Sequence, residues 1–413
     1  MHVVLFEDAL VRRLHPVTLG RAAFEMSCGS YRLVELVRRL GRPVRAAVRG
    51  HVRGVLEDTE PGFISGTCNL DDRPILLVNA RLVPSVRLLR QLEELVESGC
   101  PCKLRSGASV AAALLSPDCP RPPFDAPGER WDEFFADLQL STETVDWPLL
   151  EYPHDLIRYH AEALALNLED RLAGGGYDEI EPGVFARPGL KLGKCTVFEP
   201  AGGPIVLEEN VSIGPHCYLN GPAHLGPGAR LIEHSAIKDG VALGHTTKVG
   251  GEVECSIIEP YTNKQHHGFL GHSYLGSWVN LGAGTSNSDL KNTYGTVAME
   301  YNGARVDTGM QFIGCIVGDY SKTAVNTSIF TGKTIGACAM VYGFVTTNVP
   351  SFVNYARSFG QVTEAPVDVM VATQRRMFTR RQVTQRPSDI DLLHAMFDLT
   401  RHERQLATQP LSL

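Results

Sequence analysis

An aliphatic residue recurs at every sixth position through the middle of the chain, and a small or β-branched residue follows it four positions later. The aliphatic series is Leu207, Ile213, Leu219, Leu225, Leu231, Ile237, Leu243 and Val249. A period of six fits neither an α-helix, at about 3.6 residues, nor an alternating strand, at about 2. It is typical of a chain that makes one short strand and one turn per repeat and coils into a three-sided prism. The pattern therefore predicts a parallel β-helix of hexapeptide repeats, with the aliphatic side chains stacked inside.

This register is interrupted twice. It is lost after Val249 and partly recovered at Leu275 and Leu281, and it is lost again across residues 287–312. It then returns at Val317, Thr323, Ile329, Ile335 and Val341. We expect both interruptions to be loops that leave the prism. Because binding groups concentrate on loops held by a rigid scaffold, the functional residues are expected there.

The chain before the repeat has a different pattern. Two hydrophobic runs, at 2–8 and 74–83, predict buried strands, and segments 30–41 and 86–99 predict amphipathic helices. Strands that alternate with helices indicate an α/β domain with a largely parallel sheet.

These patterns divide the chain into four parts. Residues 1–125 form the predicted α/β domain, and residues 126–182, which follow a proline-rich stretch, form a linker and connecting helices. The β-helix occupies residues 183–350. Residues 351–413 are helical and rich in arginine, and we expect them to cover the end of the prism, where an open strand edge is exposed.

Composition narrows the range of partners. The net charge of −7 and the pI near 6.1 argue against a general nucleic-acid binder, although they allow a local basic patch for a phosphorylated ligand. No apolar run reaches the roughly 18 residues that cross a bilayer. The ten cysteines are scattered without a CxxC pair, as in a reduced compartment. We expect a cytoplasmic protein without nucleic-acid or membrane partners.

The stretch GHSYLGSWVNLGAGT, which begins at Gly271, resembles the acetyltransferase half of the bifunctional GlmU family. The family motif is roughly GH-x-x-YLGD, then VNIGAGT, then an asparagine. Members join an N-terminal uridyltransferase, of nucleotidyltransferase-like α/β fold, to a C-terminal left-handed β-helix. They make UDP-N-acetylglucosamine from glucosamine-1-phosphate, acetyl-CoA and UTP. The resemblance implies the same two-domain fold and a homotrimer, since the family's acyl site lies between neighbouring prisms. One departure is Ser277, where the family has aspartate.

The resemblance also assigns roles to residues of the repeat. His272 corresponds to the general base, and a histidine near its ordinary pKa of about 6.5 suits that task. The other matches are ligand contacts: Lys264, Tyr274, Asn280, Asn287 and Lys291 for the amino-sugar phosphate, and Ala283 and Gly343 for coenzyme A. No metal is implied at this site.

The N-terminal half is similar to the family's nucleotidyltransferase domain in fewer positions. Thr18 and Arg21 are the candidate nucleotide contacts. The glycine-rich phosphate turn is absent, and asparagine, alanine and arginine (79–81) follow the strand that should end in a magnesium-binding aspartate. The resemblance implies Mg²⁺ with UTP or another nucleoside triphosphate. The carboxylates near enough in the sequence to replace the aspartate are Glu7, Asp8, Glu25, Asp71 and Asp72.

Three functions are therefore weighed. The first is a GlmU-like enzyme that N-acetylates an amino-sugar phosphate and transfers a nucleotidyl group. The second is a non-catalytic trimeric scaffold that binds a nucleotide sugar. The third is a zinc hydratase similar to γ-class carbonic anhydrases, in which His245, His267 and His272 would bind the metal. The context of the motif favours the first function.

Overall fold

The fold was described from a computed structural model that covers residues 1–64, 73–125 and 128–404. The chain divides into two compact units. Unit 1 contains residues 1–27, 31–152 and 386–395, and unit 2 contains residues 28–30, 153–385 and the chain from 396 onward. The predicted connecting segment, 126–182, is thus shared between the two units.

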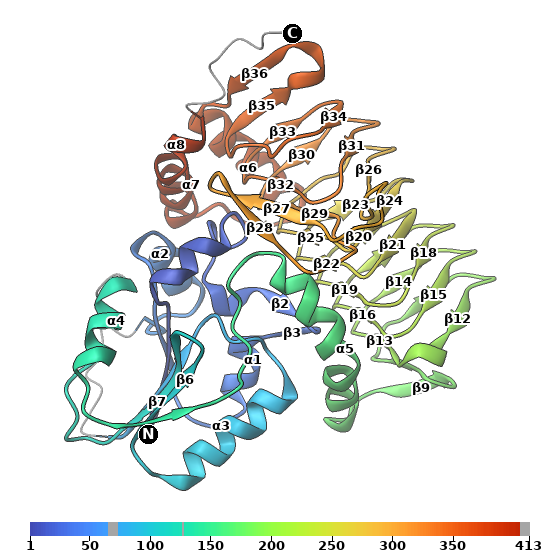
Figure 1. The fold of residues 1–413 in the computed structure, drawn as a ribbon. Helices are drawn as coiled ribbons and strands as arrows, with labels where there is room; N and C mark the ends of the chain where they lie inside the picture. Colours follow the sequence, from blue (N-terminus) through green and yellow to red (C-terminus); the bar gives the residue numbers. More distant parts are fainter. Residues whose placement is uncertain (65–72, 126–127, 405–413) are drawn as a thin grey trace. The chain divides into compact units, whose positions relative to one another are not determined.

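Unit 1 is built on a six-stranded sheet with the order β4-β1-β5-β7-β6-β8. Strands β6 and β7 of this sheet are labelled in Figure 1. The three strands β4 (Val44–Ala47), β1 (His2–Phe6) and β5 (Ile75–Asn79) are parallel. Strand β7 (Ser109–Leu115) is antiparallel to both of its neighbours. The remaining strands are β6 (Cys102–Ser106) and β8 (Ser141–Thr144). The predicted α/β fold is confirmed, with a mixed sheet in place of a largely parallel one.

Four helices accompany this sheet: α1 (Leu33–Arg38), α2 (Gly50–Thr59), α3 (Val86–Ser98) and α4 (Gly128–Asp137). Helix α3 shows how the sequence sets the ends of an element. The Ser85 hydroxyl accepts a hydrogen bond from the Leu88 N–H at its start, and Gly99 ends it in the left-handed conformation.

Unit 2 is a three-sided solenoid of parallel strands, as the six-residue period predicts (Figure 1). Face 1 contains β10 (Val184–Ala186), β13 (Ile205–Leu207), β16 (Ala223–Leu225), β19 (Val241–Leu243), β22 (Ile257–Ile258), β25 (Tyr274–Leu275), β29 (Cys315–Val317) and β32 (Lys333–Ile335). Face 2 contains β11 (Lys191–Leu192), β14 (Ser212–Ile213), β17 (Arg230–Leu231), β20 (Lys248–Val249), β23 (Asn263–Lys264), β30 (Lys322–Thr323) and β33 (Met340–Val341). Face 3 contains β12 (Val197–Glu199), β15 (Tyr218–Asn220), β18 (Ala236–Ile237), β21 (Glu252–Glu254), β24 (Phe269–Gly271), β26 (Ser286–Asn287), β31 (Ser328–Ile329) and β34 (Phe344–Val345). The eight aliphatic residues of the repeat all lie in one buried core inside these faces.

The first interruption of the register is not a loop, so that expectation is wrong. Ile258 pairs with Leu243, and Lys264 pairs with Val249, each 15 residues later instead of 18. The chain therefore stays in the wall and makes a shortened coil.

The second interruption does leave the solenoid. Val317 pairs with Leu275 although 42 residues separate them. The excursion, residues 288–314, carries a hairpin of β27 (Ala298–Tyr301) and β28 (Ala304–Asp307).

Segments outside the repeat cover parts of the solenoid. Helix α5 (Asp155–Ala173) packs Leu164 and Leu168 against Val206. The final edge is closed by β35 (Val353–Ala356) and the antiparallel β36 (Gln361–Glu364). Helix α6 (Val367–Arg380) does not cover the end as expected but lies against a side, because its Phe378 ring packs 4.6 Å from that of Trp278. The last helices are α7 (Pro387–Leu399) and α8 (Arg401–Arg404).

No helix within the described part of the chain is both apolar and long enough to span a bilayer.

Candidate active site

His272 is the first residue after β24, at the corner where face 3 turns into face 1 (corner 3–1). Its Nδ1 lies 2.8 Å from Oδ2 of Asp289, and its ring stacks on Phe312 with centroids 5.1 Å apart. Both partners belong to the excursion after β26. Since 19% of the His272 side chain is exposed, the imidazole is held firmly and still reaches the surface.

Neighbouring residues fix this position. The amide of Asn287 accepts a hydrogen bond from the Gly271 N–H (2.9 Å) and donates one to the Gly271 carbonyl (3.0 Å). A Cβ on Gly271 would lie 2.3 Å from Oδ2 of Asp289, so only glycine lets the carboxylate approach. Asn287, predicted to contact a sugar phosphate, uses its amide to hold the peptide next to His272, and its side chain is buried.

The electrostatics of the site favour a charged imidazole. Burial lowers the pKa of His272, but hydrogen bonds to Asp289 and to the Cys255 thiol outweigh it and raise that pKa to about 9. The Nδ1–H therefore donates to the carboxylate, which leaves Nε2 as the atom that exchanges its proton with a substrate. At neutral pH this atom is protonated in the free protein.

Two predicted ligand contacts lie inside the protein. Tyr274 is fully buried, and its hydroxyl donates to Oε1 of Glu259 at 2.9 Å. Lys264 occupies an inward position beside Val249 and donates to the carbonyls of Gly250 (2.6 Å), His266 (3.1 Å) and Gly268 (2.6 Å). Burial lowers the pKa of Lys264 to about 8. Its three donors are all engaged, so Lys264 binds backbone in this structure and has none left for a phosphate.

The GAGT turn lies at a different corner, where face 2 turns into face 3 (corner 2–3). The Ala283 carbonyl accepts a hydrogen bond from the Asn326 N–H at 2.7 Å, while its own N–H has no acceptor among the described residues. Gly284 and Gly343 both have positive φ at this corner, and a Cβ on Gly284 would lie 2.1 Å from the Asn326 side chain. The corner thus presents an open backbone donor, the Ala283 N–H, as an oxyanion or a thioester carbonyl requires.

Two exposed histidines share corner 2–3 with this turn. His266 and His267 lie one coil earlier, between β23 and β24, and the His267 carbonyl accepts the Gly284 N–H at 3.1 Å. From the sequence, His266 is expected to be a solvated loop residue and not a base, although a signal for the opposite exists. Two residues separate His266 from Phe269-Leu270-Gly271, as in GH-x-x-YLG, whereas only one separates His272 from Tyr274.

The last two predicted contacts lie apart from both corners. Asn280 is exposed on the outer surface of face 2, where its Oδ1 is 3.5 Å from Nδ2 of Asn263. Lys291 belongs to the excursion, and its Nζ donates to the Thr296 carbonyl at 3.0 Å.

In unit 1, two carboxylates follow β1 where a nucleotidyltransferase would bind its substrate. Nε of Arg49 lies 2.9 Å from Glu7, and Nη2 of Arg81 lies 2.6 Å from Asp8. Asn79 also donates to Asp8 at 2.8 Å. Because each carboxylate already has a guanidinium as its counter-charge, neither fits a magnesium ion.

The other nucleotide-site candidates do not complete a metal site either. Thr18 is buried and donates to the Val11 carbonyl at 3.3 Å, and the Arg21 carbonyl accepts from Arg49 at 2.7 Å. Burial raises the pKa of Glu25, whose carboxylate accepts the Ala22 N–H. Asp71 and Asp72 lie outside the described residues. Within residues 1–64, 73–125 and 128–404, no three His, Cys, Asp or Glu side chains are grouped to hold a metal.

This finding also bears on the zinc hypothesis. His245 lies between β19 and β20, His267 lies at corner 2–3 and His272 at corner 3–1. The three imidazoles occupy three different corners and do not converge within one chain.

Comparisons with known proteins agree with this organisation. The family described as "Sugar nucleotidyl transferase" matches residues 3–172, a range that includes all of the six-stranded sheet of unit 1 except His2. A bifunctional sugar-1-phosphate nucleotidylyltransferase/acetyltransferase of Sulfurisphaera tokodaii is 29% identical over 142 residues, which is 34% of this chain and 35% of the relative. The bifunctional protein GlmU of Xylella fastidiosa is 30% identical over 159 residues, 36% of this chain and 31% of the relative. The chain thus spans about a third of the length of these distant relatives.

Among solved structures, the UDP-N-acetylglucosamine acyltransferase of Francisella novicida is 16% identical and covers 57% of this chain and 79% of its own. The TM-score of 0.32 is too low to carry an argument about function.

Proposed function

We propose that this chain, a distant relative of the GlmU proteins with a sugar nucleotidyl transferase domain, is an acetyl-CoA-dependent N-acetyltransferase of an amino-sugar phosphate. Glucosamine-1-phosphate is the substrate that the sequence resemblance to the GlmU family implies, with UDP-N-acetylglucosamine as the end product if unit 1 is active. The observation that carries the proposal is corner 2–3, where the open Ala283 N–H and exposed histidines lie together on a rigid coil.

The chemistry needs a base and an oxyanion donor at one place. The sugar amine attacks the acetyl carbonyl, and an imidazole takes the amine proton. The carbon–sulfur bond then breaks, and the same imidazole passes this proton to the departing thiolate, so that coenzyme A leaves as a thiol. The Ala283 N–H is suited to the oxyanion that develops on the carbonyl oxygen. His266 is a candidate base on the same corner. His272 is the candidate on corner 3–1, where its Nε2 must first lose the proton that Asp289 stabilises before it can accept the amine proton.

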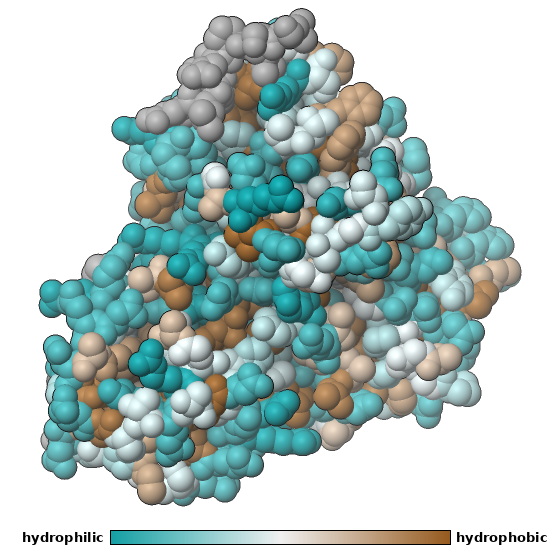
Figure 2. Space-filling view, in the orientation of Figure 1, coloured by the Kyte–Doolittle hydropathy of each residue, from teal (hydrophilic) through white to brown (hydrophobic). Residues whose placement is uncertain are grey.

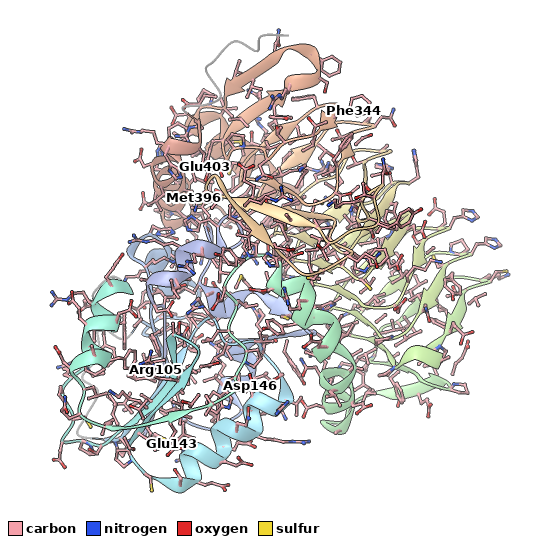
Figure 3. The ribbon with its side chains drawn as sticks, in the orientation of Figure 1. Arg105, Glu143, Asp146, Phe344, Met396 and Glu403 are labelled. Carbon is pink, nitrogen blue, oxygen red and sulfur yellow. The ribbon has the colours of Figure 1, made fainter. Side chains whose placement is uncertain are left out.

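The separation of these corners supports a trimeric assembly. His272 and Ala283 occupy different corners of one prism, so they would share a site only if corner 3–1 of one copy meets corner 2–3 of another. The last coils also expose apolar side chains: Val325, Phe330, Tyr342 and Phe344. Figure 2 shows hydrophobic atoms on the surface over these coils, and Figure 3 shows Phe344 on the outer side of the solenoid. Exposed apolar groups of this kind mark a protein interface.

The proposal is tested by a coupled assay with glucosamine-1-phosphate, acetyl-CoA and UTP, in which thiol release and UTP turnover are followed separately. His266→Ala and His272→Ala are compared with His267→Ala as a neighbouring control. Removal of the base is expected to lower thiol release about 10²–10⁴-fold and to leave UTP turnover unchanged.

The variant that loses activity identifies the base. Full acetylation by both variants, or no thiol release by the wild type with any amino-sugar phosphate, would contradict the proposal.

A second function is favoured for unit 1 alone. The neutralised Glu7 and Asp8 suggest that it binds a nucleotide sugar without turnover. Absence of magnesium-dependent UTP consumption in the same assay, with a thermal shift on addition of UDP-N-acetylglucosamine, would support this role.

A further inference from the structure

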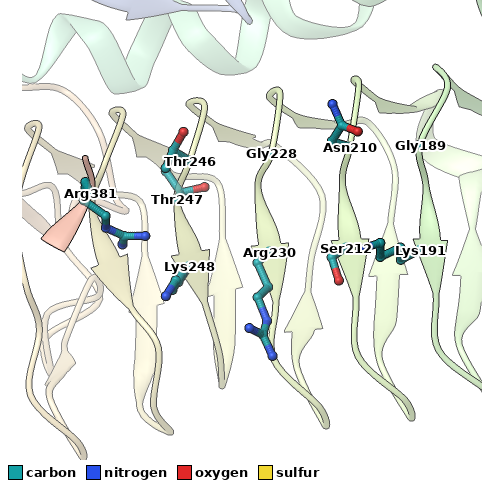
Figure 4. Close-up of a pocket in the computed structure, with 10 residues that line it drawn as sticks. All are labelled: Gly189, Lys191, Asn210, Ser212, Gly228, Arg230, Thr246, Thr247, Lys248 and Arg381. Carbon is teal, nitrogen blue, oxygen red and sulfur yellow. The ribbon is translucent and has the colours of Figure 1, made fainter. Parts of the chain in front are cut away.

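A hollow with a volume of about 280 Å³ lies on the outer surface of the first coils of face 2 (Figure 4). Side chains of β11, β14, β17 and β20 form a row along it, and Arg381 enters from the segment after α6. The uncharged polar lining of the hollow comes from Asn210, Ser212, Thr246 and Thr247.

The hollow is lined by cations that have no counter-charge. Lys191, Arg230, Lys248 and Arg381 contribute four positive groups, and no carboxylate is among the described residues that line it. None of the four forms an ion pair with a carboxylate of the described chain. Burial, and then the neighbouring charges of Arg381 and Arg230, lower the pKa of Lys248. A protein whose net charge is −7 thus concentrates positive potential at one place.

The spacing of the cations suits a particular anion. Lys248 lies beside Arg230 in the parallel pairing of β17 and β20, and neighbouring strands are about 4.8 Å apart. Ser212, Thr246 and Asn210 add uncharged donors between the cations. Arg381 is fixed by a 2.6 Å hydrogen bond from its guanidinium to Oδ1 of Asn263. Donors repeated at this interval match the oxygens of adjacent phosphate groups better than a single carboxylate.

We propose that this hollow is a binding site for the diphosphate group of a small-molecule ligand. The site lies on one face of the solenoid and includes none of His266, His272 and Ala283, so it does not rest on the proposed acetyl transfer. Nucleotide sugars and coenzyme A both carry a diphosphate, and the two sources are separated by the test.

Calorimetric titration of the full chain with inorganic pyrophosphate, UDP-N-acetylglucosamine and coenzyme A tests the site, with inorganic phosphate as a comparison. The double variant Arg230→Ser/Lys248→Thr is expected to weaken binding about tenfold for each cation removed, or about 100-fold. Binding by the wild type should also weaken as salt is raised. The control Lys238→Ser/Lys333→Ser removes the same charge elsewhere on the solenoid, and a melting curve for each variant verifies that it folds.

The site is supported if the wild type binds at least one of the three diphosphates saturably. The double variant must then lose this binding, and the control variant must keep it. The same binding by His266→Ala/His272→Ala would show that it is independent of acetyl transfer. Two results would overturn the proposal: equal affinity in the double variant, or no binding of any diphosphate by the wild type, as expected if another copy of the chain covers face 2.

Discussion

At the scale of single residues, the contact between His272 and Asp289 determines how the candidate site ionises. The imidazole lies between a carboxylate and a thiol, and its pKa is raised to about 9. The folded state therefore binds this proton more tightly than the unfolded state, in which the ordinary value is about 6.5. The stability gained from the pair is complete below about pH 6.5 and is lost as pH rises through about 9.

Replacement of Asp289 by asparagine tests this assignment. The variant keeps a group of similar shape but removes the charge, so the His272 pKa should fall toward its ordinary value. NMR titration of the His272 imidazole measures the change in its pKa. The variant His267→Gln removes the signal of the neighbouring histidine, so that the His272 resonance can be assigned. An imidazole that titrates near pH 6.5 already in the wild type would rule out the charged pair.

At the scale of elements, Lys264 stabilises the shortened coil. Its ammonium bonds three carbonyls where the chain makes a tight turn of only 15 residues per coil. Lys264→Met retains much of the apolar volume and leaves these carbonyls without their donor. Since an unsatisfied buried polar group costs about 1–3 kcal/mol, we expect the free energy of unfolding to fall by more than about 2 kcal/mol.

Chemical denaturation measures this loss, with the exposed Lys194→Met as the matched control. Equal unfolding free energies for the two variants would show that the carbonyls find other donors.

The sequence predicted the solenoid because its period arises from local stacking of side chains such as Leu225 and Leu243. It did not predict the shortened coil, because the successive inward residues Val249, Val253 and Ile258 are four and five residues apart instead of six, which breaks the register just as a loop does. It also did not show that His272 and the GAGT turn lie at different corners of the solenoid. Whether His272 or His266 faces the GAGT turn depends on the number of residues in each coil, which appears only when the strands are paired. The roles of Tyr274 and Asn287 likewise depended on burial that a motif does not encode.

At the scale of the whole molecule, the exposed apolar group on the last coils predicts self-association. Phe344 has 58% of its surface exposed on face 3. Phe344→Asp is expected to convert the proposed trimer to monomers and to abolish acetyl transfer, because the two corners would no longer meet. Size-exclusion chromatography with light scattering measures the mass, and Leu166→Asp, an exposed leucine on α5, serves as the control. A monomeric wild type with full activity would exclude a shared site.

The excursion of residues 288–314 departs from one rung of the solenoid and rejoins it on the next, because Leu275 and Val317 are paired neighbours. The solenoid is therefore continuous beneath the excursion, and the pairing of its strands does not constrain how many residues the excursion contains. The junction between Leu275 and Val317 is therefore an insertion point, where segments of other lengths and compositions can replace the excursion while the solenoid beneath stays the same.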